Sequence, residues 1–180
     1  MNHDTLLAAL RGQFDASLAM LRACLEQCPD EHWTDAADPQ RRIARYPFWM
    51  VAYHTLCFVD CYLSPSNDQW EPSPRFHPNG RQELEDEYPS RSFAKAELLE
   101  YAAYCQEKAA RVLGRGPQAP SPESLSGGSG FTWLAFTRIE LHLYNLRHVQ
   151  HHVGQLTAYL RRAGVEVAWV KSVSPPITAR

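Results

Sequence analysis

The sequence predicts an all-α fold, a four-helix bundle with long connecting loops. Four segments repeat apolar residues at spacings of three and four, which indicates amphipathic helices. Stretches rich in Pro, Gly and Ser separate these segments, and no internal repeat is present. A chain of 180 residues with 44% hydrophobic residues can bury one sizeable core. We therefore expect a single domain over residues 1–174 and a flexible tail at 175–180.

The first two helices are expected at residues 4–27 and 47–64. Asp4 can serve as the N-cap of the first, and Pro29 prevents its continuation. Pro47 suits the first turn of the second helix. This second segment is apolar almost all round, so we expect it to be the most buried helix.

The third and fourth helices are expected at residues 92–113 and 133–163. The last ends at Gly164, a residue type that favours the C-terminal capping position. From Val165 the chain alternates apolar and polar residues, which predicts an extended strand against the bundle.

Two long connections separate the helices. Residues 64–91 contain five of the 13 prolines, so we expect a surface loop that can form a wall or lid over a site. Residues 116–130 are rich in Ser, Pro and Gly and are expected to be a mobile linker.

Charge and cysteine content limit the classes of function. With 18 basic and 20 acidic residues, the chain lacks the basic excess typical of nucleic-acid binding. The apolar run at 46–59 is too short to span a membrane, and the N-terminus does not resemble a secretory signal. We therefore expect a cytoplasmic protein with no nucleic-acid or membrane partner. Its five cysteines are expected to be reduced and mostly buried.

The fourth helix carries a cluster of histidines with metal-ligand spacing. His148 and His152 lie four residues apart, so both imidazoles can face the same ion from one side of a helix. His151 lies three residues after His148, and its pairing with His148 is also possible geometrically. It points about 100° away from His152, so only one of these two can face the same groove squarely.

A zinc-type site needs at least three protein ligands, and His54 is the best third candidate. It lies in the middle of the most apolar helix, where an unpaired imidazole would be costly. His142 lies about 15 Å along the fourth helix from His152, too far to share an ion. The remaining histidines fall in connections or near the N-terminus: His3, His32 and His77. From residue types alone, a buried core histidine at 54 stays open as the alternative.

Two motifs resemble those of the DinB-like family of DNA-damage-inducible proteins. The first is Tyr53-His54-Thr55-Leu56 with Asp60-Cys61-Tyr62-Leu63, and the second runs from Tyr144 to Leu156 as YNLRHVQHHVGQL. The resemblance covers about residues 4–163. It implies an up-down-down-up bundle, frequent homodimers, and a divalent ion such as zinc or nickel on His54, His148 and His152. It also implies that His151 is not a direct ligand.

The resemblance leaves the reaction less defined than the site. Characterised relatives are transferases and isomerases that use bacillithiol, mycothiol or a similar small thiol. We therefore expect a metal-dependent enzyme of thiol transfer acting on a small molecule, because an open coordination position on zinc, nickel, manganese or iron activates a thiol or water. A metal-dependent hydrolase is the second hypothesis, although its general base would have to be Asp60 or Glu140, which we expect to be structural or exposed.

A non-catalytic metal-binding or stress-related protein is the third hypothesis. A structural ion would favour a fourth protein ligand, for which Cys57 and Cys61 are candidates. Four further residues are candidates to support the ligands without binding the ion: Gln155, Tyr144, Asn145 and His151. Gln155 can equally bond a neighbouring helix.

Overall fold

The computed structural model describes residues 3–34, 42–43, 45–85, 89–114 and 120–173. In this part of the chain the fold is all-α, as predicted, with two isolated β-bridges and no strand. The four long helices are α1 (His3–Gln27), α2 (Phe48–Tyr62), α4 (Lys95–Val112) and α6 (Arg138–Arg162). Three short helices lie in the connections: η1 (Asp30–His32), α3 (Gln82–Glu85) and α5 (Pro122–Ser126).

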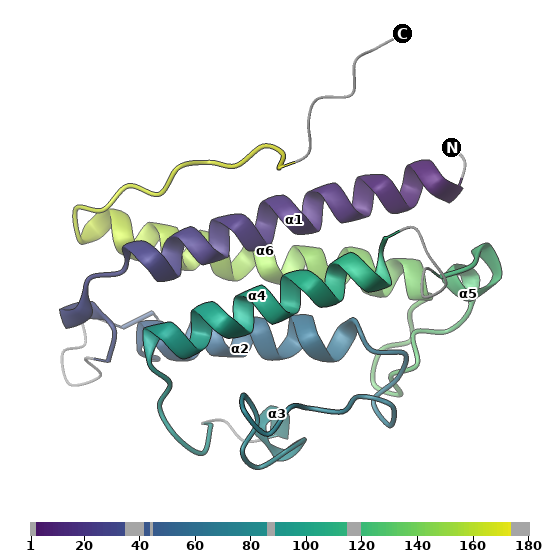
Figure 1. Cartoon of the computed structure of the whole chain (residues 1–180), viewed down its shortest axis with the longest axis horizontal. Coiled ribbons are helices and arrows are strands. Elements are labelled where there is room, and N and C mark those ends of the chain that lie inside the picture. Colours follow the sequence, from purple (N-terminus) through teal and green to yellow (C-terminus); the bar gives the residue numbers. More distant parts are fainter. Residues whose placement is uncertain (1–2, 35–41, 44, 86–88, 115–119, 174–180) are drawn as a thin grey trace, which may run out of the picture.

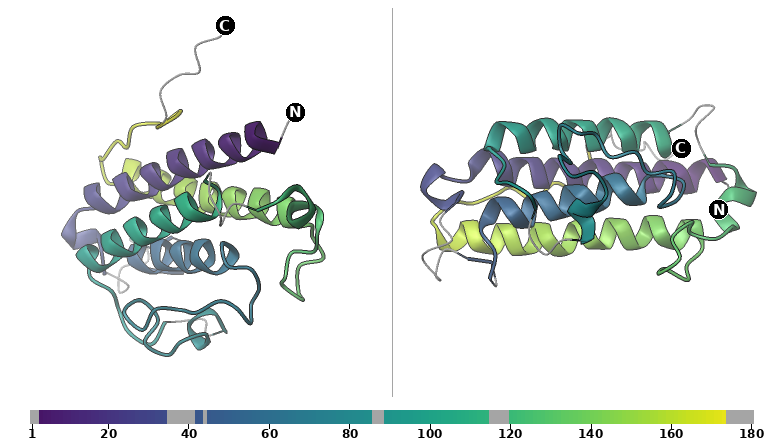
Figure 2. Two further views of the ribbon diagram at one scale, coloured as in Figure 1. Left: turned by 45° about the vertical axis from the view of Figure 1, so that its right-hand side comes forward. Right: turned by 90° about the horizontal axis from the view of Figure 1, so that it is seen from below.

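The four long helices form a bundle in which α1 and α2 each pack against both α4 and α6. Helices α1 and α6 run in one direction, and α2 and α4 run in the other (Figures 1 and 2). The core lies between them and is built from apolar side chains of all four helices, including Phe14, Leu56, Leu98 and Leu156. This packing places α2 beside α6, the two helices that carry the predicted ligands.

Helix α2 is the most apolar of the bundle, as predicted, because 13 of its 15 residues are buried. It begins immediately after Pro47, which lies in the N-cap position. The two exceptions are Phe58, which is half-buried, and His54, which is exposed. The expectation that His54 lies in an apolar interior was therefore wrong, because this position stays open to solvent beside α6.

The first residues of α1 and α6 differ from the predicted ones, because capping interactions determine where a helix begins. Helix α1 begins at His3, so Asp4 lies in the first turn, where a carboxylate favours the helix dipole, and it is not the cap. Helix α6 begins at Arg138, five residues later than expected. Thr137 Oγ1 accepts from the backbone of Glu140, and the Glu140 carboxylate accepts from the backbone of Thr137, which forms a capping box.

Helix α4 also starts late, at Lys95, because the Glu97 carboxylate accepts the backbone N–H of Ala94. At the other end of α6 the prediction holds. Gly164 adopts a φ of 79° directly after the helix, in the left-handed region that glycine tolerates.

Residues 64–91 are not simply a surface loop. The segment contains α3, and it buries Trp70, Phe76 and His77 against the bundle. Trp70 Nε1 donates to Asp60 Oδ2 over 3.1 Å, so the loop is tied to a carboxylate inside α2. The loop prediction was wrong in this respect, because its aromatic residues form part of the core.

Asp60 is the centre of this buried polar network. Its carboxylate is fully buried and also accepts from Tyr101 at 3.3 Å and from Lys108 Nζ at 2.6 Å. His77 Nε2 lies 2.6 Å from the Tyr101 hydroxyl. Burial alone would raise the pKa of Asp60, but hydrogen bonding to His77 and the charge of Lys108 outweigh it and hold that pKa below its ordinary value. Asp60 therefore joins α2, α4 and the 64–91 connection.

The chain after α6 is extended but does not form a strand. Val165, Val167 and Val170 pack against the core, and the segment runs back along α1 (Figure 1). Trp169 is 70% exposed. The predicted linker at 116–130 contains α5, and its residues 116–119 lie outside the described part, as does the predicted tail at 175–180.

All five cysteines are free and buried, as predicted. Burial raises the pKa of Cys24, Cys28 and Cys61 to about 12 and raises those of Cys57 and Cys105 as well. A thiol with a raised pKa is a poor nucleophile at neutral pH. None of the described helices is long and apolar enough to cross a membrane.

Candidate metal centre

Three histidines meet where α2 packs against α6. His54 projects from the middle of α2, and His148 and His152 project from α6, one helical turn apart. One ring nitrogen of each lies within 4.8 Å of those of the other two. The sequence predicted this trio, and the packing of α2 against α6 brings it together.

The three rings point their Nε2 atoms at one another. His148 Nε2 lies 3.2 Å from His54 Nε2 and 3.1 Å from His152 Nε2. The ring centroids of His54 and His152 are 5.0 Å apart, and those two rings meet edge to face. The three nitrogens therefore form the corners of a compact triangle.

This triangle has the size that a first-row metal ion requires. Zinc–imidazole bonds of about 2.0–2.1 Å at tetrahedral angles place two ligand nitrogens roughly 3.3 Å apart. The two nitrogen separations, 3.2 and 3.1 Å, agree with that value. His148 Nε2 faces two other imidazole nitrogens and can make a good N–H···N bond with only one of them, whereas one cation can satisfy all three lone pairs. The three residues fit a divalent ion.

The imidazoles are held in their neutral form, which is the form that binds metals. Although His54 is partly open to solvent, desolvation where α2 packs against α6 and the neighbouring His152 lower the pKa of its imidazole to about 4. Burial and the other histidines lower that of His148 to about 3, and burial also lowers the pKa of His152. At neutral pH the three rings can therefore coordinate an ion without first losing protons.

Gln155 fixes the orientation of His152. Its Oε1 atom lies 2.9 Å from His152 Nδ1, and because a carbonyl oxygen only accepts, His152 carries its proton on Nδ1. That tautomer leaves the Nε2 lone pair free to face the other two rings. Gln155 Nε2 lies 3.2 Å from Nε2 of the exposed His151. Gln155 contacts an imidazole of its own helix, and its role in supporting a metal ligand stays a prediction.

His151 does not belong to the triangle. Its ring stacks edge to face on His152 at 5.0 Å between centroids, and its contact with the site passes through Gln155. Tyr144 also lies apart, since its ring contacts are with Tyr62 and Phe136.

Asn145 lies one turn before the ligand pair and is fully buried. Both polar atoms of its side chain lack a hydrogen-bond partner in the described residues, and so does Nδ1 of His148, three positions later on α6. Because the two residues do not bond each other, a role of Asn145 in holding the His148 ring stays a prediction.

The ligand group contains no fourth protein atom in the described part of the chain, since no Cys, Asp or Glu joins the three histidines. Cys57 Sγ lies 3.9 Å from His77 Nδ1 in the interior, and Cys61 is buried in a satellite cluster with Trp70. Asp60 and Glu140 have structural roles, as expected, in the buried network and in the α6 cap. The exposure of His54 leaves the open side of the triangle facing solvent.

Two residues of the site were missed by sequence reasoning. Phe58 packs edge to face on both His54 and His148, at 4.8 and 5.3 Å between centroids. Its position four residues after His54 is a signal that helical spacing could have given. Glu83 lines a cleft of about 40 Å³ beside His54, and its carboxylate accepts from Ser90. No local pattern points to Glu83.

The fold and the site together define a class of protein: a helical bundle whose candidate metal centre is formed by three imidazoles between two helices. The chain matches the sequence model of the DinB family over residues 14–176. The match covers most of the chain, which therefore belongs to the DinB family, as the two motifs indicated. A comparison with curated proteins returned no match.

Proposed function

We propose that the protein holds one divalent ion, zinc or nickel, on Nε2 of His54, His148 and His152, and that it transfers a small thiol to an electrophilic small molecule. The observation that carries the proposal is the convergence of three neutral imidazoles, one of them exposed and two half-buried, between α2 and α6. With three protein ligands, a tetrahedral ion keeps one position for an exogenous ligand. A fully ligated structural ion would need a fourth protein atom, and none of the described residues offers one there.

The chain's own groups favour an external nucleophile. A divalent ion lowers the pKa of a thiol that reaches it, so the sulfur becomes nucleophilic near neutral pH. The five cysteines are buried, and burial raises the pKa of their thiols, which makes them poor nucleophiles. The attacking sulfur therefore has to come from a cosubstrate. Gln155 keeps the His152 lone pair directed at the ion position, and Phe58 forms an apolar wall beside two ligand rings.

Hydrolysis is the less supported alternative. It requires a general base within reach of a water, and the carboxylates suggested by the sequence have other hydrogen-bond partners. Glu83 lines the cleft beside His54, but its carboxylate already accepts hydrogen bonds from Ser90 and Asn79.

The experiment measures thiol transfer with zinc- or nickel-loaded protein, bacillithiol or mycothiol, and 1-chloro-2,4-dinitrobenzene as the electrophile. A C–S bond forms, chloride leaves, and the thiol proton passes to buffer. We expect wild type and His151→Ala to accelerate the reaction, and His148→Ala to lose at least tenfold in rate. Equal rates for wild type and His148→Ala would contradict thiol transfer at this site. Ester cleavage without thiol would instead support the hydrolase, and metal binding without turnover would support a non-catalytic role.

A further inference from the structure

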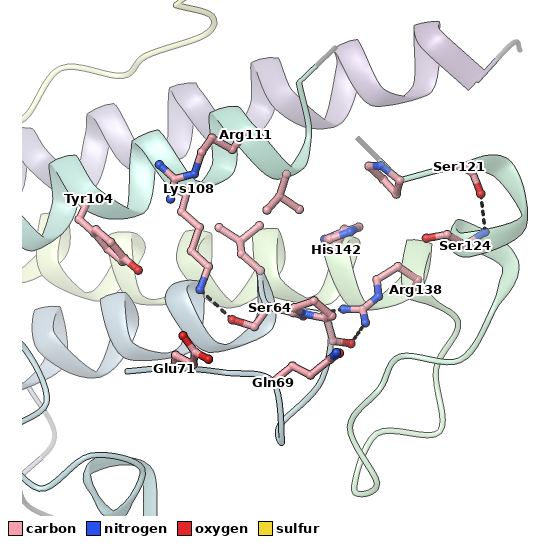
Figure 3. A pocket seen from close by; sticks show the side chains of 14 residues that line it. Ser64, Gln69, Glu71, Tyr104, Lys108, Arg111, Ser121, Ser124, Arg138 and His142 are labelled. Carbon is pink, nitrogen blue, oxygen red and sulfur yellow. Dashed lines mark hydrogen bonds between the residues drawn. The ribbon is translucent and has the colours of Figure 1, made fainter. Parts of the chain in front are cut away.

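A second cavity, of about 700 Å³, opens at the end of the bundle where α2 and α4 end and α6 begins. Its volume lies in the range of small-molecule sites, roughly 300–1,000 Å³. None of its lining residues belongs to the histidine triangle. Figure 3 shows Arg138 and His142 from α6 on one side, and Tyr104, Lys108 and Arg111 from α4 on the other.

Arg138 is held in place while keeping free donors. Its guanidinium donates to the backbone oxygens of Ser64, at 2.9 Å, and Pro65. A guanidinium has five N–H donors, so at least two further donors stay free for a ligand. Carbonyl oxygens do not neutralise its charge, and no carboxylate of the described residues pairs with it. Arg138 is therefore a fixed cation in the wall of the cavity without an anionic partner.

The charges of the lining leave one positive charge in excess. The three donors of Lys108 are used by Asp60 Oδ1, Asp60 O and Ser64 Oγ, so Asp60 cancels its charge. Arg111 is exposed and makes no ion pair within the described residues. Glu71 is the one acidic residue among the described residues of the lining. Arg111 and Arg138 against Glu71 leave a single net positive charge, which matches a monoanion.

His142 provides an independent sign that the cavity accepts a polar ligand. The residue is 1% exposed, and its Nδ1 atom has no hydrogen-bond partner in the described part of the chain. Buried polar atoms are normally satisfied, so the unpartnered nitrogen of this lining residue points to a hydrogen-bond partner that the described side chains do not supply. Burial and the charge of Arg138 lower the pKa of His142 to about 4, so the ring is neutral at pH 7.

We propose that this cavity binds a small organic monocarboxylate, with its carboxylate on Arg138 and Arg111 and a polar atom hydrogen-bonded to His142 Nδ1. Guanidinium groups pair with carboxylates through charge-assisted bonds. Leu63, Pro65 and Val112 add apolar surface to the wall, which suits a ligand with an apolar body. The negative charge of Glu71 disfavours a dianion such as phosphate.

The test uses benzoate as the probe and neutral benzamide as its isostere, observed by saturation-transfer NMR on the full-length protein. We expect saturable binding of benzoate, no measurable binding of benzamide, and weaker binding of inorganic phosphate than of benzoate. Arg138→Gln is expected to weaken benzoate at least tenfold. Arg111→Gln is expected to weaken benzoate binding about threefold. It keeps the test valid if Arg138→Gln fails to fold, because exposed Arg111 makes no hydrogen bond or ion pair with the described residues.

His148→Ala is the matched control for the metal centre, because a carboxylate can also ligate a metal ion. Benzoate binding retained in His148→Ala and lost in the arginine variants supports the cavity site. Loss in His148→Ala with retention in both arginine variants would place benzoate on the metal and overturn the proposal. Equal affinity for benzoate and benzamide, or tighter binding of phosphate, would overturn it as well.

Discussion

A single hydrogen bond determines how one of the three imidazoles, His152, is presented. His152 carries its proton on Nδ1 because Gln155 Oε1 accepts it at 2.9 Å, and this leaves Nε2 free. Partners of this kind orient metal ligands and contribute to affinity, although they do not touch the ion.

We predict that Gln155→Met weakens zinc binding by about 10- to 100-fold, because the variant keeps the side-chain length but loses the acceptor. Gln155→Glu, which retains an oxygen acceptor, should bind zinc at least as tightly as wild type. Competition with a chromophoric chelator measures both affinities. If Gln155→Met bound zinc as tightly as wild type, the hydrogen bond between His152 and Gln155 would make no contribution to metal binding.

The sequence alone identified His54, His148 and His152 as candidate ligands, but it predicted a buried position for His54, which is exposed. Spacing predicts which residues share a helix face, and it predicted the pair on α6 correctly. It does not say which face of an apolar helix is left uncovered. His54 is exposed although it lies next to α6, and which positions stay uncovered depends on the packing of distant segments.

At the scale of the elements, the Asp60 network joins α2, α4 and the 64–91 connection. The carboxylate is fully buried, and Lys108 from α4 and Trp70 from the connection both bond to it. Removing one partner of a buried charge pair leaves the other charge uncompensated, which typically costs about 3–5 kcal/mol.

We predict that Asp60→Asn lowers the free energy of unfolding by about 3–5 kcal/mol at pH 7, measured by urea denaturation. The pKa of Asp60 is lowered in the folded state, so its stabilising effect is present above the unfolded-state pKa of about 3.9. It is lost as the pH falls from there toward the folded-state pKa. The difference between wild type and Asp60→Asn should therefore shrink below about pH 4.

Glu71→Gln is a matched control, because Glu71 is exposed and lies outside the Asp60 network. It should change the unfolding free energy at pH 7 by less than about 0.5 kcal/mol. A difference between wild type and Asp60→Asn that stays constant down to pH 3 would contradict the assigned role of the carboxylate.

Helix number and order followed from periodicity, whereas helix starts depended on capping. The α6 cap was readable, since Thr137-Arg138-Ile139-Glu140 fits the capping-box pattern and identifies the true start. The burial of Trp70 and His77 was not readable. Their segment is rich in Pro and charges. Its attachment depends on the bond from Trp70 to Asp60, 10 positions away, and on the contact of His77 with Tyr101, 24 positions away.

At the scale of the whole molecule, the bundle arrangement determines where chemistry can occur. His54 and His148 are 94 positions apart in sequence, and the packing of α2 against α6 brings their Nε2 atoms to 3.2 Å. The end of the bundle, where α6 begins, holds the separate cavity with Arg138 and His142. The family match and the histidine spacing led to the first region, whereas nothing in the sequence pattern indicated the second.

The central claim is that the histidine triangle binds a metal ion, and elemental mass spectrometry of untagged protein tests it most directly. Wild type is to be measured beside His54→Ala, His148→Ala and His152→Ala, with His151→Ala as the control. We predict close to one divalent ion per chain in wild type and in the control, and loss of that ion in the three ligand variants. Metal retained in all four variants, or absent from wild type supplied with zinc and nickel, would contradict the claim and identify the three histidines as polar packing residues.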